Sequence, residues 1–263
     1  MPLGGWGIPG AFSVSAEAPE TDGWTPGAGL IGSDAVAVAP AAFFNPFKSP
    51  SPDFTAAWYI PQPWGHMDFS AVVRPTLEVK DGAFVDRTFA GYGAHFSGDV
   101  KPGWFGRNKD RITWQFTAGD GIGRYLGNSS GFALITNYPA AAPASLAAAN
   151  NVRIRTTVSW GGQTSYQHWW TPSLHSNVSF GILHHDINNL GGAGFVCPTR
   201  VAAAAGAGGC GLNKELISSA LNLVWNPVPF ADIAVEYFHG HRLVLSNLKG
   251  DVNGMISRFR VTF

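Results

Sequence analysis

Charged residues are scarce in this sequence. Asp, Glu, Lys and Arg make up 13% of the 263 residues, and their charges cancel to a formal net charge of 0. A soluble globular domain usually carries about 25% charged residues, so this chain has less of the surface that keeps proteins in water. It also has no basic cluster with interleaved aromatic residues, so we predict no nucleic-acid partner. The composition favours a protein whose surface is partly covered by something other than water.

Long hydrophobic runs are also absent. A membrane-spanning helix needs about 18 or more consecutive apolar residues, and the longest candidates, residues 36–44 and 140–149, are short and interrupted by proline. Inside lipid every backbone N–H and C=O must be paired, so a closed β-barrel is the remaining way to cross a bilayer.

Cysteine is rare as well. Cys197 and Cys210 lie in one stretch rich in glycine and alanine. A disulfide between them would close this loop and would persist in an oxidising compartment, while two unpaired thiols are the alternative. Neither a CxxC spacing nor a suitable His pair accompanies them, so we predict no metal site and no cofactor. Residues 1–5 lack the charged and apolar regions of a secretory signal, so none is expected.

What the chain does have is alternation of apolar and polar residues. In residues 255–263 the odd positions are mostly apolar and the even ones include Arg258 and Arg260. A period of two predicts a β-strand with one apolar and one polar face. Phe263 lies on the apolar side, which is typical of the last strand of outer-membrane β-barrels.

The same pattern recurs about ten times. Between the segments, short turns such as 169–174 and 225–230 contrast with long loops at about 21–52, 128–150 and 188–213, and this asymmetry is typical of outer-membrane barrels. We therefore predict a single all-β domain over residues 1–263, an antiparallel transmembrane β-barrel. A β-sandwich with the aromatic residues in its core is the alternative. The alternating segments are residues 12–17, 54–60, 66–74, 87–97, 111–118, 152–161, 177–185, 217–226, 233–238 and 255–263.

Several of these segments resemble one family. Residues 110–126 are similar to a strand-and-loop signature of DcaP-like outer-membrane porins, as are residues 221–228, 232–237 and 249–253 with the terminal Phe263. Residues 12–21 are similar to a strand in the middle of that family's barrel. The resemblance covers nearly all of this chain but only the carboxy-terminal part of the family pattern. The strands therefore form part of a larger barrel, or a barrel of about ten strands closes alone. The resemblance implies a homotrimeric channel in the cell outer membrane that passes small solutes, often anions such as dicarboxylates.

The polar faces of the strands supply the candidate lumen residues. Their excess of arginine predicts a lumen that attracts anions, and guanidinium groups suit carboxylates well. For each arginine the alternative is a structural ion pair with a neighbouring acid. The long loop at 21–52 could fold inward as a constriction. The candidate residues are Arg74, Arg111, Arg153, Arg155, Arg258 and Arg260, with the acids Asp68 and Glu236.

Two other functions compete with the porin. His184, His185 and Asp186 stand together at a strand end, where a membrane-embedded enzyme could transfer protons. No serine-centred motif or isolated carboxylate pair accompanies them, so we predict that the chain is not an enzyme. A secreted carbohydrate-binding β-sandwich would be soluble without detergent. The function that the sequence favours is an outer-membrane porin for passive diffusion of small hydrophilic solutes.

Overall fold

The fold is known from a computed structural model. It describes residues 9–20, 23–25, 29–31, 47–80, 84–103, 109–126, 133–136, 145–146, 150, 152–187, 213–244 and 247–262.

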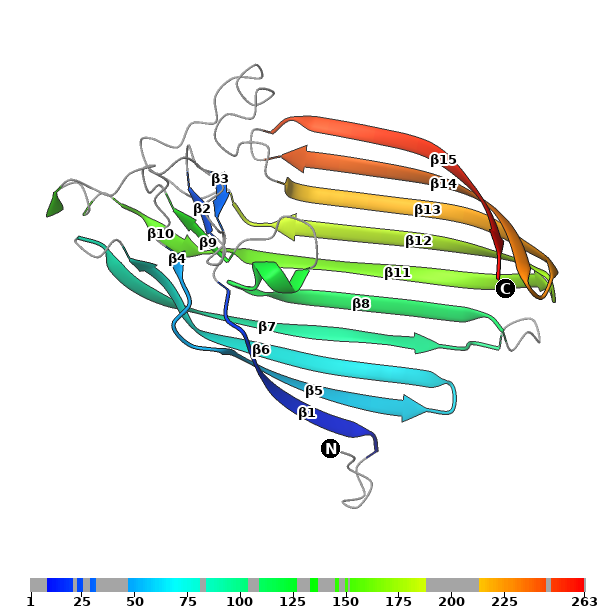
Figure 1. Ribbon diagram of the computed structural model, residues 1–263, viewed down its shortest axis with the longest axis horizontal. Helices are drawn as coiled ribbons and strands as arrows, with labels where there is room; N and C mark the ends of the chain where they lie inside the picture. The colour runs from blue at the N-terminus through cyan, green and yellow to red at the C-terminus, as the bar shows by residue number, and fades with distance from the viewer. Residues whose placement is uncertain are drawn as a thin grey trace.

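Ten antiparallel strands follow one another in the main sheet (Figure 1). This number agrees with the sequence prediction, and the all-β antiparallel architecture is confirmed. A further short strand, β4 (Phe47–Lys48), pairs with one end of β6. In spatial order the ten are β1 (Ala11–Glu17), β5 (Asp53–Gln62), β6 (Gly65–Lys80), β7 (Asp86–Val100), β8 (Arg111–Asp120), β11 (Val158–Thr171), β12 (Leu174–His185), β13 (Asn213–Val228), β14 (Ala231–Val244) and β15 (Lys249–Val261).

The two ends of the main sheet have different connections. At the turn end, where β5 passes into β6, β11 into β12 and β13 into β14, tight hairpins use residues 63–64, 172–173 and 229–230. At the loop end lie the long connections from β1 to β5, β8 to β11 and β12 to β13. The predicted asymmetry between short turns and long loops is present.

The register of the strands gives the sheet two distinct faces. Phe12 pairs with Trp58, Trp58 with Phe69, Phe69 with Phe96 and Phe96 with Phe116, so these side chains lie on one face. This apolar face continues to β15, because the same parity connects all ten strands. Its exposed members include Val14, Phe54, Val73, Tyr92, Val178, Phe180, Leu221, Leu223, Trp225, Ile233, Val235, Tyr237, Met255 and Phe259.

The opposite face is polar. It carries buried Asp53, Arg74, Asp99, Ser159 and Asp232. Strand residues of one parity are therefore mostly apolar and exposed, and the other parity includes several buried charged side chains, which is the reverse of a soluble sheet packed on a core.

The long loops are more structured than the sequence predicted. Four short strands form a second sheet in the order β10 (Ile154–Thr156), β9 (Leu134–Thr136), β2 (Gly23–Thr25) and β3 (Gly29–Ile31), located at the loop end (Figure 1). The prediction of one strand over residues 152–161 is wrong in part, because the chain leaves the small sheet and enters the main sheet at Thr157. There the amide of Thr157 donates to the carbonyl of Ala133, and its carbonyl accepts from Gly121.

A small hydrophobic core joins this second sheet to the loop end of β6 and β7. Its fully buried members include Phe47, Leu77, Val79 and Leu134, and Phe89 packs against this core. Gly23 lies against the ring of Phe47, and any Cβ there would collide with it. Near β6 and β7, the polar side of the loop end is thus covered by side chains from segments far apart in sequence.

The main sheet has two outer edges. Within the described residues neither β1 nor β15 has a second strand neighbour, so the predicted closure into a barrel stays a prediction. Because nine antiparallel steps separate them, β1 and β15 run in opposite directions.

In the part of the chain that the structure describes, we find no helix that is both long enough and apolar enough to cross a membrane.

Candidate functional site

The candidate site lies on the polar face of the main sheet, near the loop end. After β8 the chain turns over this face and forms a single 3-10 turn, η3 (Gly123–Leu126). Gly121 adopts φ 68°, a conformation that favours glycine, and this reverses the chain direction. The residues 121–126, called the docked segment below, therefore cover polar side chains of their own sheet.

Two glycines let the docked segment approach the sheet. A Cβ at Gly93 would lie 2.7 Å from Ile122 Cγ2, and one at Gly119 would lie 2.9 Å from the same atom. Real Cβ atoms do not tolerate such contacts, so the buried Ile122 side chain occupies a notch that only glycines provide. Packing of Ile122 thus fixes the position of Tyr125 three residues later.

The ion pair between Arg74 and Asp53 anchors the docked segment to the sheet. Arg74, on β6, is 1% exposed, and its Nε donates to Asp53 Oδ2 at 3.0 Å. Its Nη1 donates to the carbonyl of Gly121 at 2.7 Å, and its Nη2 donates to the carbonyl of Glu20. Arg74 was predicted to line the lumen, but its donors instead hold together β5, the docked segment and the chain beyond β1.

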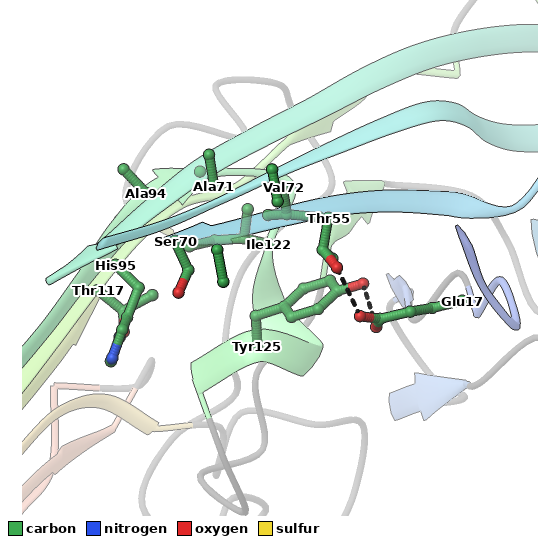
Figure 2. A pocket seen from close by; sticks show the side chains of 13 residues that line it. Glu17, Thr55, Ser70, Ala71, Val72, Ala94, His95, Thr117, Ile122 and Tyr125 are labelled. Carbon is green, nitrogen blue, oxygen red and sulfur yellow. Dashed lines mark hydrogen bonds between the residues drawn. The ribbon is translucent and has the colours of Figure 1, made fainter. Parts of the chain in front are cut away.

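Tyr125 contacts the carboxylate of Asp53 and also that of Glu17, and Figure 2 shows the contact with Glu17. Its hydroxyl lies 3.1 Å from Glu17 Oε2 and 3.0 Å from Asp53 Oδ2, and donates its proton to one of them. Burial and the neighbouring Asp53 carboxylate raise the pKa of Tyr125 well above its usual value, so the hydroxyl remains a donor. Arg124 completes the cluster by donating to the carbonyl of Ala18 at 2.8 Å.

Glu17 is the more accessible acid of this cluster. Its Oε1 accepts from Thr55 Oγ1 at 3.0 Å and from Ser15 Oγ at 3.2 Å, while its Oε2 faces Tyr125. A carboxylate has about four lone-pair sites, so one further donor can still be accepted.

Two cavities lie on either side of Tyr125. The first, of about 270 Å³, is bounded by the docked segment and strands β1 and β5 to β8 (Figure 2). The second, of about 450 Å³, extends from Tyr125 across β11, β12 and β13, where Gln163 and Ser218 line it. The docked segment therefore divides the polar face into two concave regions.

At the turn end, Arg111 lies on the polar face as predicted. Its Nε donates to Asp99 Oδ2 at 2.8 Å, and His66 Nδ1 contacts the other oxygen of that carboxylate. The Arg111 side chain is 49% exposed while Asp99 is 4% exposed, so the guanidinium group remains accessible.

Arg258 and Arg260 are brought together by one acid. Arg258 Nη2 lies 2.9 Å from Asp232 Oδ1, and Arg260 Nε lies 2.6 Å from Asp232 Oδ2. Both arginine side chains are more than half exposed, whereas Asp232 is 3% exposed. Two guanidinium groups share one carboxylate, which leaves one formal positive charge at this position.

The other predicted lumen residues are more scattered. Asp68 and Glu236 lie on the polar face, where Asp68 accepts from Ser70 at 2.7 Å and Glu236 accepts from Asn222 at 3.1 Å. Arg153 precedes β10 and Arg155 lies within it, so both belong to the loop end rather than to a wall of the main sheet. The expected strand position of these two arginines is wrong, because the chain changes sheets at Thr157.

A separate polar cluster interrupts the apolar parity at the turn end. Asp110 is fully buried and accepts from Tyr166 at 2.9 Å, from the amide of Trp169 at 3.0 Å, and bonds His168 Nδ1 at 2.8 Å. Burial alone would raise the pKa of Asp110, but the hydrogen bonds from Trp169, His168 and Tyr166 outweigh it and lower this pKa below its usual value.

The residues suggested for a rim enzyme do not form one site. His184 and His185 are successive strand residues, so their side chains lie on opposite faces. His184 lies 3.7 Å from Glu215, while His185 is buried against Ser159. Among the described residues, no group of three or more His, Cys, Asp and Glu residues is arranged to hold a metal ion. Cys197 and Cys210 lie outside the described residues.

Sequence reasoning missed the acids that organise the site. Asp53, Asp99 and Asp232 all stand within three residues of a turn-end or loop-end strand boundary and share the parity of the arginines. This shared parity is the sequence signal from which these three acids could have been predicted to lie beside the arginines. Nothing in the local sequence places Tyr125 beside Glu17, because the docked segment connects residues more than 100 positions apart.

Comparison with known proteins supports the fold. No family model and no curated protein matches the sequence. Among solved structures the chain is similar to the outer membrane channel DcaP of Acinetobacter baumannii, with a TM-score of 0.58, 16% identity and coverage of 96% of this chain. The chain spans 58% of the length of that structure. A similarity at this low identity shows a porin-like fold.

Proposed function

We propose that this chain is part or all of an outer-membrane channel that passes small hydrophilic solutes and carries out no enzymatic reaction. One observation supports this most strongly. The exposed large apolar side chains of the described strands lie almost all on one face of a ten-stranded sheet, and the opposite face is polar. A transmembrane β-barrel, with a lipid-facing apolar exterior and a polar lumen, has this pattern.

The dimensions agree with a membrane. On β13 the apolar parity runs from Ile217 to Trp225, nine residues. At about 3.4 Å per residue this is roughly 27 Å along the strand, and a tilt of about 40° reduces it to roughly 21 Å of height. An outer-membrane barrel needs an apolar band of about 25 Å. Trp58, Trp170 and Trp225 lie toward the turn end of the apolar face, where an interfacial girdle is expected.

We further propose that the channel prefers anions, including dicarboxylate-like solutes. At the turn end, the exposed Arg258 and Arg260 share the single carboxylate of Asp232, which leaves one formal positive charge at that position. Arg111 is paired with Asp99, and Asp68 lies on the same face. Positive charge on a lumen wall attracts anions and raises their entry rate. A homotrimer in the cell outer membrane, with lipid against the apolar face, completes this proposal.

The docked segment is a better candidate for the constriction than the loop at 21–52. It lies on the polar face between the two cavities and is held by Arg74 and Tyr125, whose partners come from three separate parts of the chain. The role of the loop at 21–52 stays a prediction, because most of that loop lies outside the described residues.

The test is to fold the purified chain in detergent and to record planar-bilayer currents under a salt gradient. We expect discrete conductance steps with a reversal potential that favours anions. Folded, β-rich protein that inserts in the bilayer but never conducts would contradict the channel, and a cation-favouring potential would contradict the anion preference alone.

A further inference from the structure

We infer that the 270 Å³ cavity beside Tyr125 is a binding site for small organic cations, compounds with one apolar ring and one ammonium group. The inference rests on the proposed channel only in placing the cavity on a solute path. It is independent of the arginines at the turn end, which lie on other parts of the polar face.

The cavity has an apolar body. Ala57, Val72 and Ile122 line it, Gly93 contributes no side chain, and the Tyr125 ring forms one wall. Figure 2 shows the Tyr125 ring on one side of this space and the strands that carry Ala71, Val72 and Ala94 on the other. An enclosed apolar cavity of about 150 Å³ is large enough to take a benzene molecule. A partly open cavity of 270 Å³ therefore has room for a ring with a short substituent.

Its charge is negative. Among the described residues that line the cavity, Glu17 is the formally charged carboxylate, and Arg74 and Arg124 are not part of the lining. The donors of Arg74 are directed at Asp53 and at two backbone carbonyls, and Arg124 donates to a third carbonyl. A ligand carboxylate would therefore meet a like charge, while an ammonium group would meet a carboxylate that has a free lone pair.

The walls are held in place before any ligand arrives. Tyr125 is fixed through Glu17, Asp53 and the notch that holds Ile122, and Thr55 fixes the Glu17 carboxylate from the sheet side. A preorganised site loses little conformational entropy on binding. At the opposite end, His95 Nδ1 is engaged by Thr117 at 2.7 Å, and the other ring nitrogen is able to bond a polar substituent.

The test compares three probes of the same size on the folded full chain in detergent: benzylamine, benzyl alcohol and benzoate. Binding is measured by equilibrium dialysis and by saturation-transfer NMR, neither of which requires conduction. We expect saturable binding of benzylamine, binding about tenfold weaker for benzyl alcohol, and no saturable binding of benzoate; a factor of ten corresponds to about 1.4 kcal/mol.

Four variants assign the binding to this cavity. Glu17→Gln removes the charge and Ala57→Leu fills the space, and each is expected to weaken benzylamine binding about tenfold or more. The matched controls are Glu215→Gln and Ala220→Leu, both on β13 and four strands from β7, which should leave binding unchanged. Circular dichroism and heat-modifiable migration confirm that each variant is folded.

Benzoate binding as tightly as benzylamine would overturn the inference, as would benzylamine binding that is insensitive to both cavity variants. Conduction without benzylamine binding would contradict the site and leave the channel standing. Binding of benzylamine without conduction would support the site and contradict the proposed channel.

Discussion

The turn end and the loop end of the main sheet are stabilised in different ways. At the turn end, tight hairpins connect neighbouring strands, and the polar contacts join residues of adjacent strands, as in the pair of Arg258 with Asp232. At the loop end, the small core and the docked segment join residues that are distant in sequence, as Tyr125 joins Glu17. We therefore expect the turn end to tolerate substitutions that the loop end does not.

The largest effect should follow from breaking the buried ion pair at the loop end. Asp53→Ala leaves the guanidinium group of Arg74 buried without its carboxylate, and removing one partner of a buried pair costs about 3–5 kcal/mol. We expect a large drop in the midpoint of urea unfolding in detergent, together with loss of the docked segment. Asp68→Ala, on the same face but hydrogen-bonded among the described residues to Ser70, is the control. Equal stability of the two variants would contradict the comparison.

A smaller loss should come from the hydrophobic core at the loop end. Phe47 is fully buried against Leu77 and Val79, and truncating such a ring to alanine costs about 3 kcal/mol or slightly more. Phe47→Ala is therefore expected to lower the unfolding midpoint, and to expose the loop end to limited proteolysis. Phe230→Ala, at an exposed turn-end position, should change little. Similar losses from both would show that the two ends are equally well packed.

At the turn end we expect a pH-dependent effect of lesser size. The pKa of Asp110 lies below its usual value, so its stabilising contribution is complete above about pH 4 and is lost as the pH falls through the lowered pKa. Asp110→Asn should reduce stability at neutral pH by on the order of 1 kcal/mol. The stabilities of wild type and variant should converge once the pH falls below the lowered pKa of Asp110, measured as melting temperatures across pH. A constant difference down to the lowest pH would refute this.

The smallest effect on stability should come from the shared arginine pair. Arg258→Gln and Arg260→Gln each leave the other arginine paired with Asp232, so the fold should remain intact. Each variant is expected to shift the reversal potential under a salt gradient toward zero, because one positive charge leaves the lumen wall. Arg87→Gln, at the loop end, serves as the control. An unchanged reversal potential in both arginine variants would mean that the turn end does not select ions.

The same contrast explains what the sequence could predict. The strand around Ile217 to Trp225 follows from local alternation and was predicted correctly. The turn after it was predicted at 225–230, but the strand continues through Pro227 to Val228 and the turn uses residues 229–230. The change of sheet at Thr157 was not predictable, because the alternation continues through it and hydrogen bonds to Ala133 and Gly121 decide it. Parity placed Arg74, Arg111, Arg258 and Arg260 on the polar face. It did not reveal that each one faces a buried aspartate, because the acids lie at strand ends that the pattern defines poorly.

The opposite directions of β1 and β15 limit how this sheet can be completed. If every added neighbour is antiparallel, the number of strands inserted between these two edges must be zero or even. A contribution of one or three strands would bring two parallel edges together at the seam and would break the alternation of the hydrogen-bond ladder. This rule is satisfied when the two edges join directly, when six further strands are added, and when ten strands of a second copy are added. It is not satisfied by an antiparallel barrel of seventeen strands.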